Sequence, residues 1–305
     1  MAPARQYHIN TIQTEISAFC TGKFVTDNNS LPPFGTYAPN IVQRWIITLT
    51  RGLPEGWLGR RLAFALRKLV LVTLRRPLDV KVFEQNMRVH PFANVCEKRV
   101  LFTPQFFDLT ERTAIADALR DDFTFIDIGA NVGAYSLFVA SVAKPGTTII
   151  AIEPQPEVFA RLTANIRLNP GCAIKAISCA VSDRDGEVSL FLGGQNQGEA
   201  SIKFVSMSGN GGTSVTVPAK SLVTIASDEN LDHIDALKLD VEGAEDLILV
   251  PFFSTAPQSL WPRMIILENA SQRWQTDCVQ LCLDNGYEKT MTTRMNVVLT
   301  RQEPS

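Results

Sequence analysis

The chain has 305 residues, of which 45% are hydrophobic and 20% are charged, a composition typical of globular proteins and unlike disordered or fibrous ones. The 29 basic and 31 acidic residues give a net charge of −2, which argues against bulk nucleic-acid binding, since that needs a strongly basic surface. The sequence has no run of about 18 apolar residues, so we expect no transmembrane helix. The first residues lack the basic-then-apolar order of a signal peptide, and we expect a cytoplasmic protein.

The cysteines and histidines do not have the spacing of a metal site or of a disulfide framework. We therefore expect no metal, and we expect the thiols to be reduced and mostly buried. The residues concerned are Cys20, Cys96, Cys172, Cys179, Cys278 and Cys282, with His8, His90 and His233.

Residues 1–77 predict an extension that is irregular at first and helical from about Ile41. Between Trp57 and Arg76, basic residues recur every seven to eight positions and so share one helix face, which Pro77 ends. The favoured interpretation is that the apolar remainder packs on the body of the protein, because its arc is wider than an interfacial helix needs. The alternative is peripheral contact with an anionic membrane or an acidic partner.

Residues 78–122 predict a cap segment rich in strands, with β-like runs at Val80–Phe83, Met87–His90 and Arg99–Phe102 and a helix at Arg112–Leu119. From residue 123 to residue 305, strands alternate with helices. This order predicts an α/β domain with a mostly parallel sheet and helices on both faces. The expected strands are Phe123–Ile128, Thr147–Ile152, Ile174–Val181, Ala236–Leu239 and Arg263–Leu267. The expected helices are Val132–Ala143, Glu157–Leu168, Gly243–Leu249 and Arg273–Asn285.

Two antiparallel pairs complete this prediction. Glu187–Leu192 and Ser214–Pro218 flank a turn-rich excursion at Gly193–Gly212. Tyr287–Thr290 and Asn296–Leu299 form a closing hairpin that makes the sheet mixed. Ligands of such sheets bind at the carboxyl ends of the strands, so polar residues there are candidates for a site.

The first strand runs into a glycine loop that contains Asp127, Gly129, Ala130, Asn131 and Gly133. The glycines remove side chains where the backbone turns, and Asn tolerates positive φ better than most residues. The spacing differs from the dinucleotide pattern G-x-G-x-x-G. It therefore predicts a wider loop that holds a ligand without a pyrophosphate, with Asp127 as an acceptor for an ammonium group.

The second and third strands are also followed by acids. Glu153-Pro154 lies 24 residues beyond Gly129, close to the roughly 20-residue spacing at which a carboxylate reaches a ribose diol. Ser182-Asp183 follows the third strand, where an acceptor can reach the base of a nucleoside. Ordinary turn chemistry explains Asp183 almost as well.

The fourth strand ends in the densest cluster of charge. Asp240, Glu242 and Glu245 lie within six residues, beside Lys238 on the strand. Such crowding is costly unless a cation or hydrogen-bond donors lie among the acids, and clusters of this kind tend to be functional. Glu268 follows the fifth strand and faces the same edge.

Together these stretches resemble the FkbM family of S-adenosylmethionine-dependent methyltransferases, over about residues 100–300. The residues that carry the resemblance are 125–133 (Phe-Ile-Asp-Ile-Gly-Ala-Asn-Val-Gly), 151–154 (Ala-Ile-Glu-Pro), 180–183 (Ala-Val-Ser-Asp), 238–245 (Lys-Leu-Asp-Val-Glu-Gly-Ala-Glu) and 265–268 (Ile-Ile-Leu-Glu). The resemblance implies a class I methyltransferase fold, Rossmann-like with an antiparallel final strand. It also implies S-adenosylmethionine as cofactor and O-methylation of a sugar, glycan or natural-product hydroxyl.

The same resemblance implies roles for the residues at the strand ends. Asp127, Gly129, Ala130, Asn131 and Gly133 would hold the methionine part of the cofactor. Glu153, with Pro154, would hold the ribose, and Ser182-Asp183 the adenine side. Asp240 would lie near the methyl group. A hydroxyl acceptor also needs a general base, for which Asp240 and Glu268 are the candidates, with Glu242 behind them.

Two other functions remain open from the sequence. One is an NAD-dependent oxidoreductase on the same type of sheet, and the other is a non-catalytic member that binds adenosylmethionine or a partner. We expect residues 78–110 and the 193–212 excursion to form the acceptor pocket, but neither stretch predicts which acceptor it takes.

Overall fold

The computed structural model describes residues 31–54, 56–92, 94–192, 200–202, 214–269 and 271–301. The chain divides into the units Met1–Pro33 and Phe34–Ser305. All the elements below belong to the second unit. The predicted 193–212 excursion lies outside the described residues except at 200–202, and so does Cys20.

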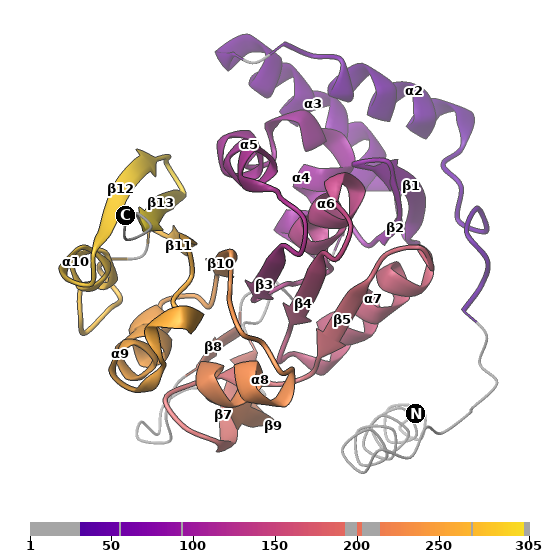
Figure 1. The fold of residues 1–305 in the computed structure, drawn as a ribbon. Coiled ribbons are helices and arrows are strands. Elements are labelled where there is room, and N and C mark those ends of the chain that lie inside the picture. Colours follow the sequence, from indigo (N-terminus) through magenta and orange to yellow (C-terminus); the bar gives the residue numbers. More distant parts are fainter. Residues whose placement is uncertain are drawn as a thin grey trace. The chain divides into compact units, whose positions relative to one another are not determined.

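Within the described residues, seven strands form the main sheet (Figure 1). Their order is β12-β13-β11-β10-β3-β4-β5. The five central strands are parallel, and β13 is antiparallel to both of its neighbours. The bounds are β3 Thr124–Ile128, β4 Thr148–Ile152, β5 Ile174–Ile177, β10 Ala236–Leu239, β11 Met264–Glu268, β12 Tyr287–Thr292 and β13 Asn296–Arg301. This is the predicted class I methyltransferase arrangement with its antiparallel final strand.

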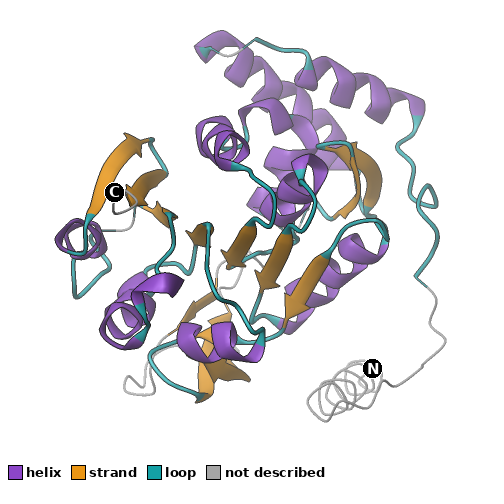
Figure 2. Ribbon diagram, viewed as in Figure 1, coloured by secondary structure: helices purple, strands orange, loops and turns teal. Residues whose placement is uncertain are grey.

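Alternate residues of each central strand enter two different hydrophobic cores. Phe125 packs on one face with α6, whereas Ile126 packs on the other with α8, α9 and α10 (Figure 2). Because side chains alternate along a strand, Asp127 and Lys238 lie on the face that α6 covers. The helix bounds are α6 Ala134–Val142, α7 Pro156–Arg167, α8 Leu222–Asp228, α9 Glu245–Thr255 and α10 Cys278–Asp284, with a short 3-10 helix, η2, at Gln258–Leu260.

The predicted third strand is in fact two. It is broken after Ile177, and its second part is β6 (Ala180–Val181) in a separate sheet with order β6-β9-β7-β8. The partners are β7 (Gly186–Leu192), β8 (Ala200–Ile202) and β9 (Ser214–Lys220). The sequence from Ile174 to Val181 predicts a single strand because both parts are apolar. The break cannot be recognised in the sequence, because β6 pairs with β9 at residues 39 positions further along the chain, Ala180 with Ala219.

The cap segment contains more helix than the sequence predicts. Its bounds are β1 Leu78–Val82, β2 Gln85–Val89, α4 Val95–Phe102, η1 Pro104–Phe106 and α5 Leu109–Ala118. The predicted strand at Arg99–Phe102 is wrong, because these residues form the last turn of α4, whose first turn the Asn94 side chain caps at Cys96 N. The helix predicted at Arg273–Asn285 is also shorter, since Asp277 caps it and α10 begins at Cys278.

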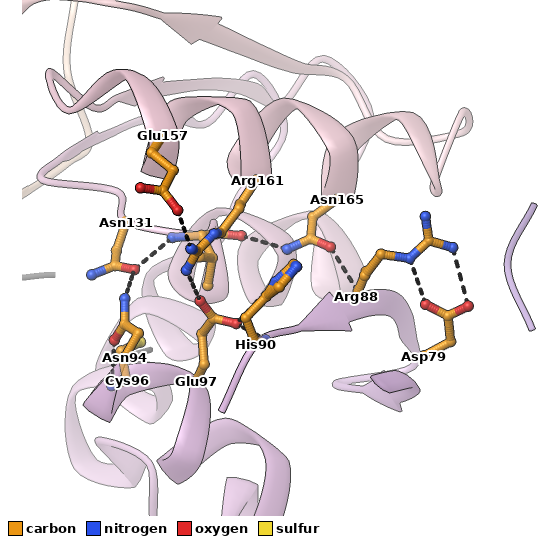
Figure 3. Close-up of polar contacts among 11 residues, drawn as sticks. Asp79, Arg88, His90, Asn94, Cys96, Glu97, Asn131, Glu157, Arg161 and Asn165 are labelled. Atoms are coloured by element: carbon orange, nitrogen blue, oxygen red, sulfur yellow. Dashed lines mark hydrogen bonds and ion pairs between the residues drawn. The ribbon is translucent and has the colours of Figure 1, made fainter. Parts of the chain in front are cut away.

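A network of buried polar groups fixes the cap to α7 (Figure 3). Glu97 is fully buried, accepts a hydrogen bond from His90 N and lies 3.1 Å from Arg161 Nη1. Asn165 accepts from Arg88 N and donates to Val132 O. The β1–β2 hairpin is thereby held against the glycine loop.

The helices α2 (Ile41–Arg51) and α3 (Trp57–Thr73) form a hairpin next to the cap. The interpretation that the wide apolar face of α3 packs inward is wrong. Only a narrow stripe around Ala63 and Val70 is buried, whereas Leu58, Phe64 and Val72 are exposed. Among the described residues, no helix is both long and apolar enough to cross a membrane.

Five cysteines lie in the described part of the chain, and all five are free thiols, as predicted. Cys179, Cys278 and Cys282 are buried and Cys96 and Cys172 are half-buried.

Candidate active site

Four carboxylates meet at the carboxyl ends of four neighbouring strands. Asp127 lies on β3, Glu153 follows β4, Asp240 follows β10 and Glu268 ends β11. The strand order places these ends side by side. The sequence prediction that acids from distant parts of the chain share one edge of the sheet is therefore in agreement with the topology.

A buried lysine lies among these acids. Lys238 Nζ is 3.1 Å from Asp240 Oδ2 and 3.8 Å from Asp127 Oδ1, and it lies 5.0 Å from the centre of the Tyr135 ring. Burial lowers the pKa of Lys238, but Asp240 and Asp127 raise it more, so that its pKa lies above the ordinary value. The ammonium is therefore charged and neutralises part of the cluster.

Asp127 is buried and has one free acceptor. Ser136 Oγ donates to Asp127 Oδ2 at 2.7 Å, whereas Oδ1 accepts no hydrogen bond from any described residue. Burial raises the pKa of this carboxyl, and Lys238 opposes the shift. An unpartnered buried oxygen is costly, so Oδ1 is suited to a donor that the ligand brings.

The glycine loop packs tightly against its neighbours. Gly129 has φ +76°, and a Cβ there would collide with the Asp240 carbonyl oxygen. Gly133 has φ +88°, and a Cβ would lie 2.8 Å from Leu162 Cδ1. Asn131 has φ 52° and Ala130 N donates to Ile152 O. Close packing against the end of β10 therefore explains Gly129, and close packing against α7 explains Gly133.

Glu153 closes this loop from the β4 side. Its carboxylate accepts hydrogen bonds from Asn131 N and Gln155 N, both at 2.9 Å, across the intervening Pro154. Burial raises the pKa of Glu153 to about 7, although the two backbone N–H groups oppose the shift. A carboxylate has about four acceptor positions, so two remain for ligand hydroxyls.

In the acidic loop after β10, two glutamates make contacts that hold the loop, and Asp240 is left at the sheet edge. Glu242 has φ 58° and pairs with Arg273 Nη1 at 2.9 Å. Glu245 is fully buried and accepts from Val241 N, Gly243 N and Trp274 Nε1. Glu245 therefore holds the loop in place, and Asp240 presents its half-exposed carboxylate at the edge.

Glu268 forms no ion pair with any described residue, although the more distant Arg273 partly offsets the repulsion from its acidic neighbours. Burial raises its pKa to about 7, and repulsion from Asp240, Glu242 and Glu245 adds to the shift. Its Oε2 is buried and accepts no hydrogen bond within the described part of the chain. A carboxyl with this pKa can take up a proton near neutral pH.

Ser182 and Asp183 lie apart from these four carboxylates. They follow β6 in the small sheet, where Ser182 N donates to Lys220 O and Ser182 Oγ to Asp183 Oδ1. Asp183 lies 3.5 Å from Arg184 Nε. Ser182 is therefore held by β9, and Asp183 has its partners within its own turn.

The sequence analysis missed the residues that the cap brings to the site. Tyr135 Oη donates to Asp108 Oδ2 at 3.1 Å, and Arg99 Nη2 lies 2.5 Å from Asp108 Oδ1. Asn94 Nδ2 donates to Asn131 Oδ1 at 2.7 Å (Figure 3). Burial and then Asp108 raise the pKa of Tyr135 well above its ordinary value, so the hydroxyl keeps its proton. The only signal in the sequence was the position of Tyr135, two residues after Gly133.

Comparison with known proteins agrees with this geometry. Residues 127–291 match the family model described as the methyltransferase FkbM domain. The chain is 29% identical over 172 residues to Methyltransferase sdnD of Sordaria araneosa, which covers 48% of this chain and 63% of the relative. It is 28% identical over 172 residues to the 31-O-demethyl-FK506 methyltransferase FkbM of Streptomyces tacrolimicus, with 48% and 64% covered. The matches thus span less than two thirds of these relatives.

Among solved structures, the chain is similar to methyltransferase FkbM from Methylobacillus flagellatus KT. The identity is 14% and the TM-score is 0.36, with 67% of this chain and 54% of the other covered.

Proposed function

We propose that this chain, which belongs to the FkbM methyltransferase family, uses S-adenosylmethionine to methylate a hydroxyl of a sugar, glycan or natural-product type small molecule. The observation that carries this proposal is Glu268, an unpaired carboxyl with a pKa of about 7 at the edge of the sheet. A hydroxyl acceptor needs such a base, because it must lose its proton as the new bond forms. The family match gives no support to an NAD-dependent oxidoreductase.

The chain's own residues fit the cofactor chemically. S-adenosylmethionine supplies a methyl group on a positively charged sulfonium, and it carries an ammonium group and a ribose diol. Asp127 offers a buried carboxylate oxygen that accepts no hydrogen bond from the described residues, which suits the ammonium. Glu153 has acceptor positions left for the diol. The glycine loop, with Gly129, Ala130, Asn131 and Gly133, would lie along the methionine part, and Ser182 and Asp183 on the adenine side.

In this proposal the three acids predicted to be catalytic have different roles. Glu268 takes the proton of the acceptor hydroxyl, since Lys238 already neutralises Asp240. Asp240 is the second candidate for the base and, through Lys238, fixes the orientation of the acids at the edge. Glu242 orders the loop through Arg273. The rate gain comes mainly from alignment of the reacting groups, which the rigid strand ends provide.

Two experiments test the proposal. Calorimetry with S-adenosylhomocysteine should show binding, and Glu153→Ala should weaken it by about 1.5–3 kcal/mol, the scale of hydrogen bonds to a charged group. Tritiated methyl transfer into fractionated cell extract should label a small molecule, in which the label is on oxygen. A label on nitrogen or carbon would reject O-methylation, and unchanged affinity of the variant would remove Glu153 from the ribose role.

A further inference from the structure

The outer faces of α2 and α3 carry large apolar side chains that are about half or more exposed. On α2 they are Ile41, Val42, Trp45 and Leu49. On α3 they are Trp57, Leu58, Leu62, Phe64, Leu69 and Val72. Trp45 is 73% exposed and Trp57 is 64% exposed. An exposed apolar patch of this extent marks an interaction surface.

Helix geometry gathers these side chains on one side of each helix. Residues 41, 42, 45 and 49 share a face of α2, while Gln43, Ile47 and Thr50 face inward. On α3 the inward stripe passes through Ala63, Val70 and Leu74. The two helices lie side by side, so their outer faces form one surface, named here the hairpin face (Figure 1).

The segment that forms the hairpin is also strongly basic. Residues 41–77 contain eight basic residues and one acidic residue, a net charge of +7 in a chain whose total is −2. Arg61, Lys68, Arg75 and Arg76 are exposed among the apolar side chains. The Arg61 guanidinium lies 4.4 Å from the centre of the Trp57 ring.

A hollow of about 480 Å³ brings these features together. It is lined by Trp57, Arg60, Arg61, Phe64, Ala65 and Lys68. Three cations and two aromatic rings around one hollow suit an anionic headgroup whose acyl chains lie beside apolar side chains. Tryptophan at the boundary of water and hydrocarbon, with long cationic side chains nearby, is typical of membrane interfaces.

We propose that the hairpin face binds the surface of an anionic lipid bilayer. The apolar side chains enter the interfacial region, and the cations pair with lipid phosphates. A second copy of this chain fits the face poorly, because a two-fold contact would bring together two basic hairpins, each with a net charge of +7 over residues 41–77. The proposal is independent of the methyl acceptor.

Bilayer binding would also fix the position of the cap. Arg51 on α2 donates to Leu101 O at 2.9 Å and to Lys81 O at 2.8 Å, and Gln105 donates to Thr50 O at 3.0 Å. The hairpin is therefore tied to β1 and to α4, whose capping residue Asn94 reaches the glycine loop at Asn131.

The test uses the full chain and two kinds of vesicle, phosphatidylcholine alone and phosphatidylcholine with phosphatidylserine. The protein should sediment with the second kind and not the first, less so at high salt. The double variant R61E/K68E removes two cations, each of which strengthens binding to an anionic surface about fivefold. It should therefore lower the protein's vesicle partition constant at least roughly 30-fold. The matched control R167E/K289E, with the same charge change at exposed positions on α7 and β12, should stay within about twofold of wild type.

A second variant separates insertion from charge. W45A/W57A should weaken binding to anionic vesicles and remove the blue shift of tryptophan emission. All variants should melt at the wild-type temperature, since the altered side chains are exposed. Wild-type protein that stays in the supernatant, or R61E/K68E that binds like wild type, would overturn the proposal. So would a stable dimer in sedimentation velocity that W45A/W57A dissociates, since a second copy would then cover the face.

Discussion

The Lys238 ammonium lies 3.1 Å from the Asp240 carboxylate, at the point where β10 ends. Lys238 is buried and Asp240 is half-exposed, so this ion pair links the interior of the sheet to its edge. Asp127 lies directly opposite Lys238 on the neighbouring strand. This arrangement turns a cluster of like charges into an ion-paired group and makes Lys238 the centre of the site.

Replacing Lys238 should be strongly destabilising. Lys238→Met leaves Asp127 buried without a counter-ion, and we expect the free energy of unfolding to fall by about 3–5 kcal/mol. Urea unfolding measures the loss. Adding Asp127→Asn should restore part of it, and Lys289→Met, at an exposed position, should change stability by less than about 0.5 kcal/mol. A loss below about 1 kcal/mol for Lys238→Met would contradict the importance of the pair.

Glu268 should make stability depend on pH. Its pKa is about 7 in the folded chain, against an ordinary value of 4.5. Between these values the folded state binds more protons than the unfolded state, so this group's contribution falls as pH rises from 4.5 to 7 and is level above. Glu268→Gln resembles the protonated form and should therefore gain stability over wild type across this window.

Because Glu268 is only half-buried, we expect a gain of about 1 kcal/mol at pH 7 rather than the full linkage value. Urea unfolding of both proteins from pH 4.5 to 8 gives the difference. Glu153 titrates in the same range in both proteins, so its effect cancels. A difference that does not change with pH would show that the Glu268 pKa is ordinary.

Turnover should distinguish the two candidate bases. With the acceptor identified by tritium labelling, Glu268→Gln should lower kcat by roughly 10²–10⁴, the usual contribution of a general base. S-adenosylhomocysteine affinity should be nearly unchanged. Asp240→Asn should have the smaller effect on kcat. The reverse order would assign the base to Asp240.

Two glutamates that share one arginine offer a matched comparison. Arg161 lies 3.1 Å from fully buried Glu97 and 2.7 Å from Glu157, whose side chain is 58% exposed. Glu97→Gln should cost about 3–5 kcal/mol, because it breaks a buried pair. Glu157→Gln should cost less than about 1 kcal/mol. Equal effects in thermal or urea unfolding would mean that burial does not decide the strength of these contacts.

The glycine loop should tolerate no side chain at Gly129. Gly129→Ala forces a Cβ against the Asp240 carbonyl at positive φ, and we expect a loss above about 1 kcal/mol. Gly171→Ala is the control, since a Cβ there meets open space. It should be neutral or slightly stabilising. A loop that accepts Gly129→Ala without loss of stability or of S-adenosylhomocysteine affinity would show that its close approach to β10 is dispensable.

The sequence by itself determined the sheet and the carboxylates at its edge. Alternating apolar runs specify buried strands, and parallel strands place their carboxyl ends together. Asp127, Glu153, Asp240 and Glu268 could therefore be assigned to one edge before any contact was known. Lys238 could also be expected to be buried, because helices cover both faces of a parallel sheet.

Only the tertiary structure decided how these groups are paired. Tyr135 meets Asp108 and Arg99 across the boundary between cap and sheet, and nothing local in the sequence records such a contact. Likewise, the apolar pattern of α3 is the same whether its outer side is covered or exposed. Burial, pairing and the resulting pKa values depend on residues that are distant in the chain, and folding alone brings these residues together.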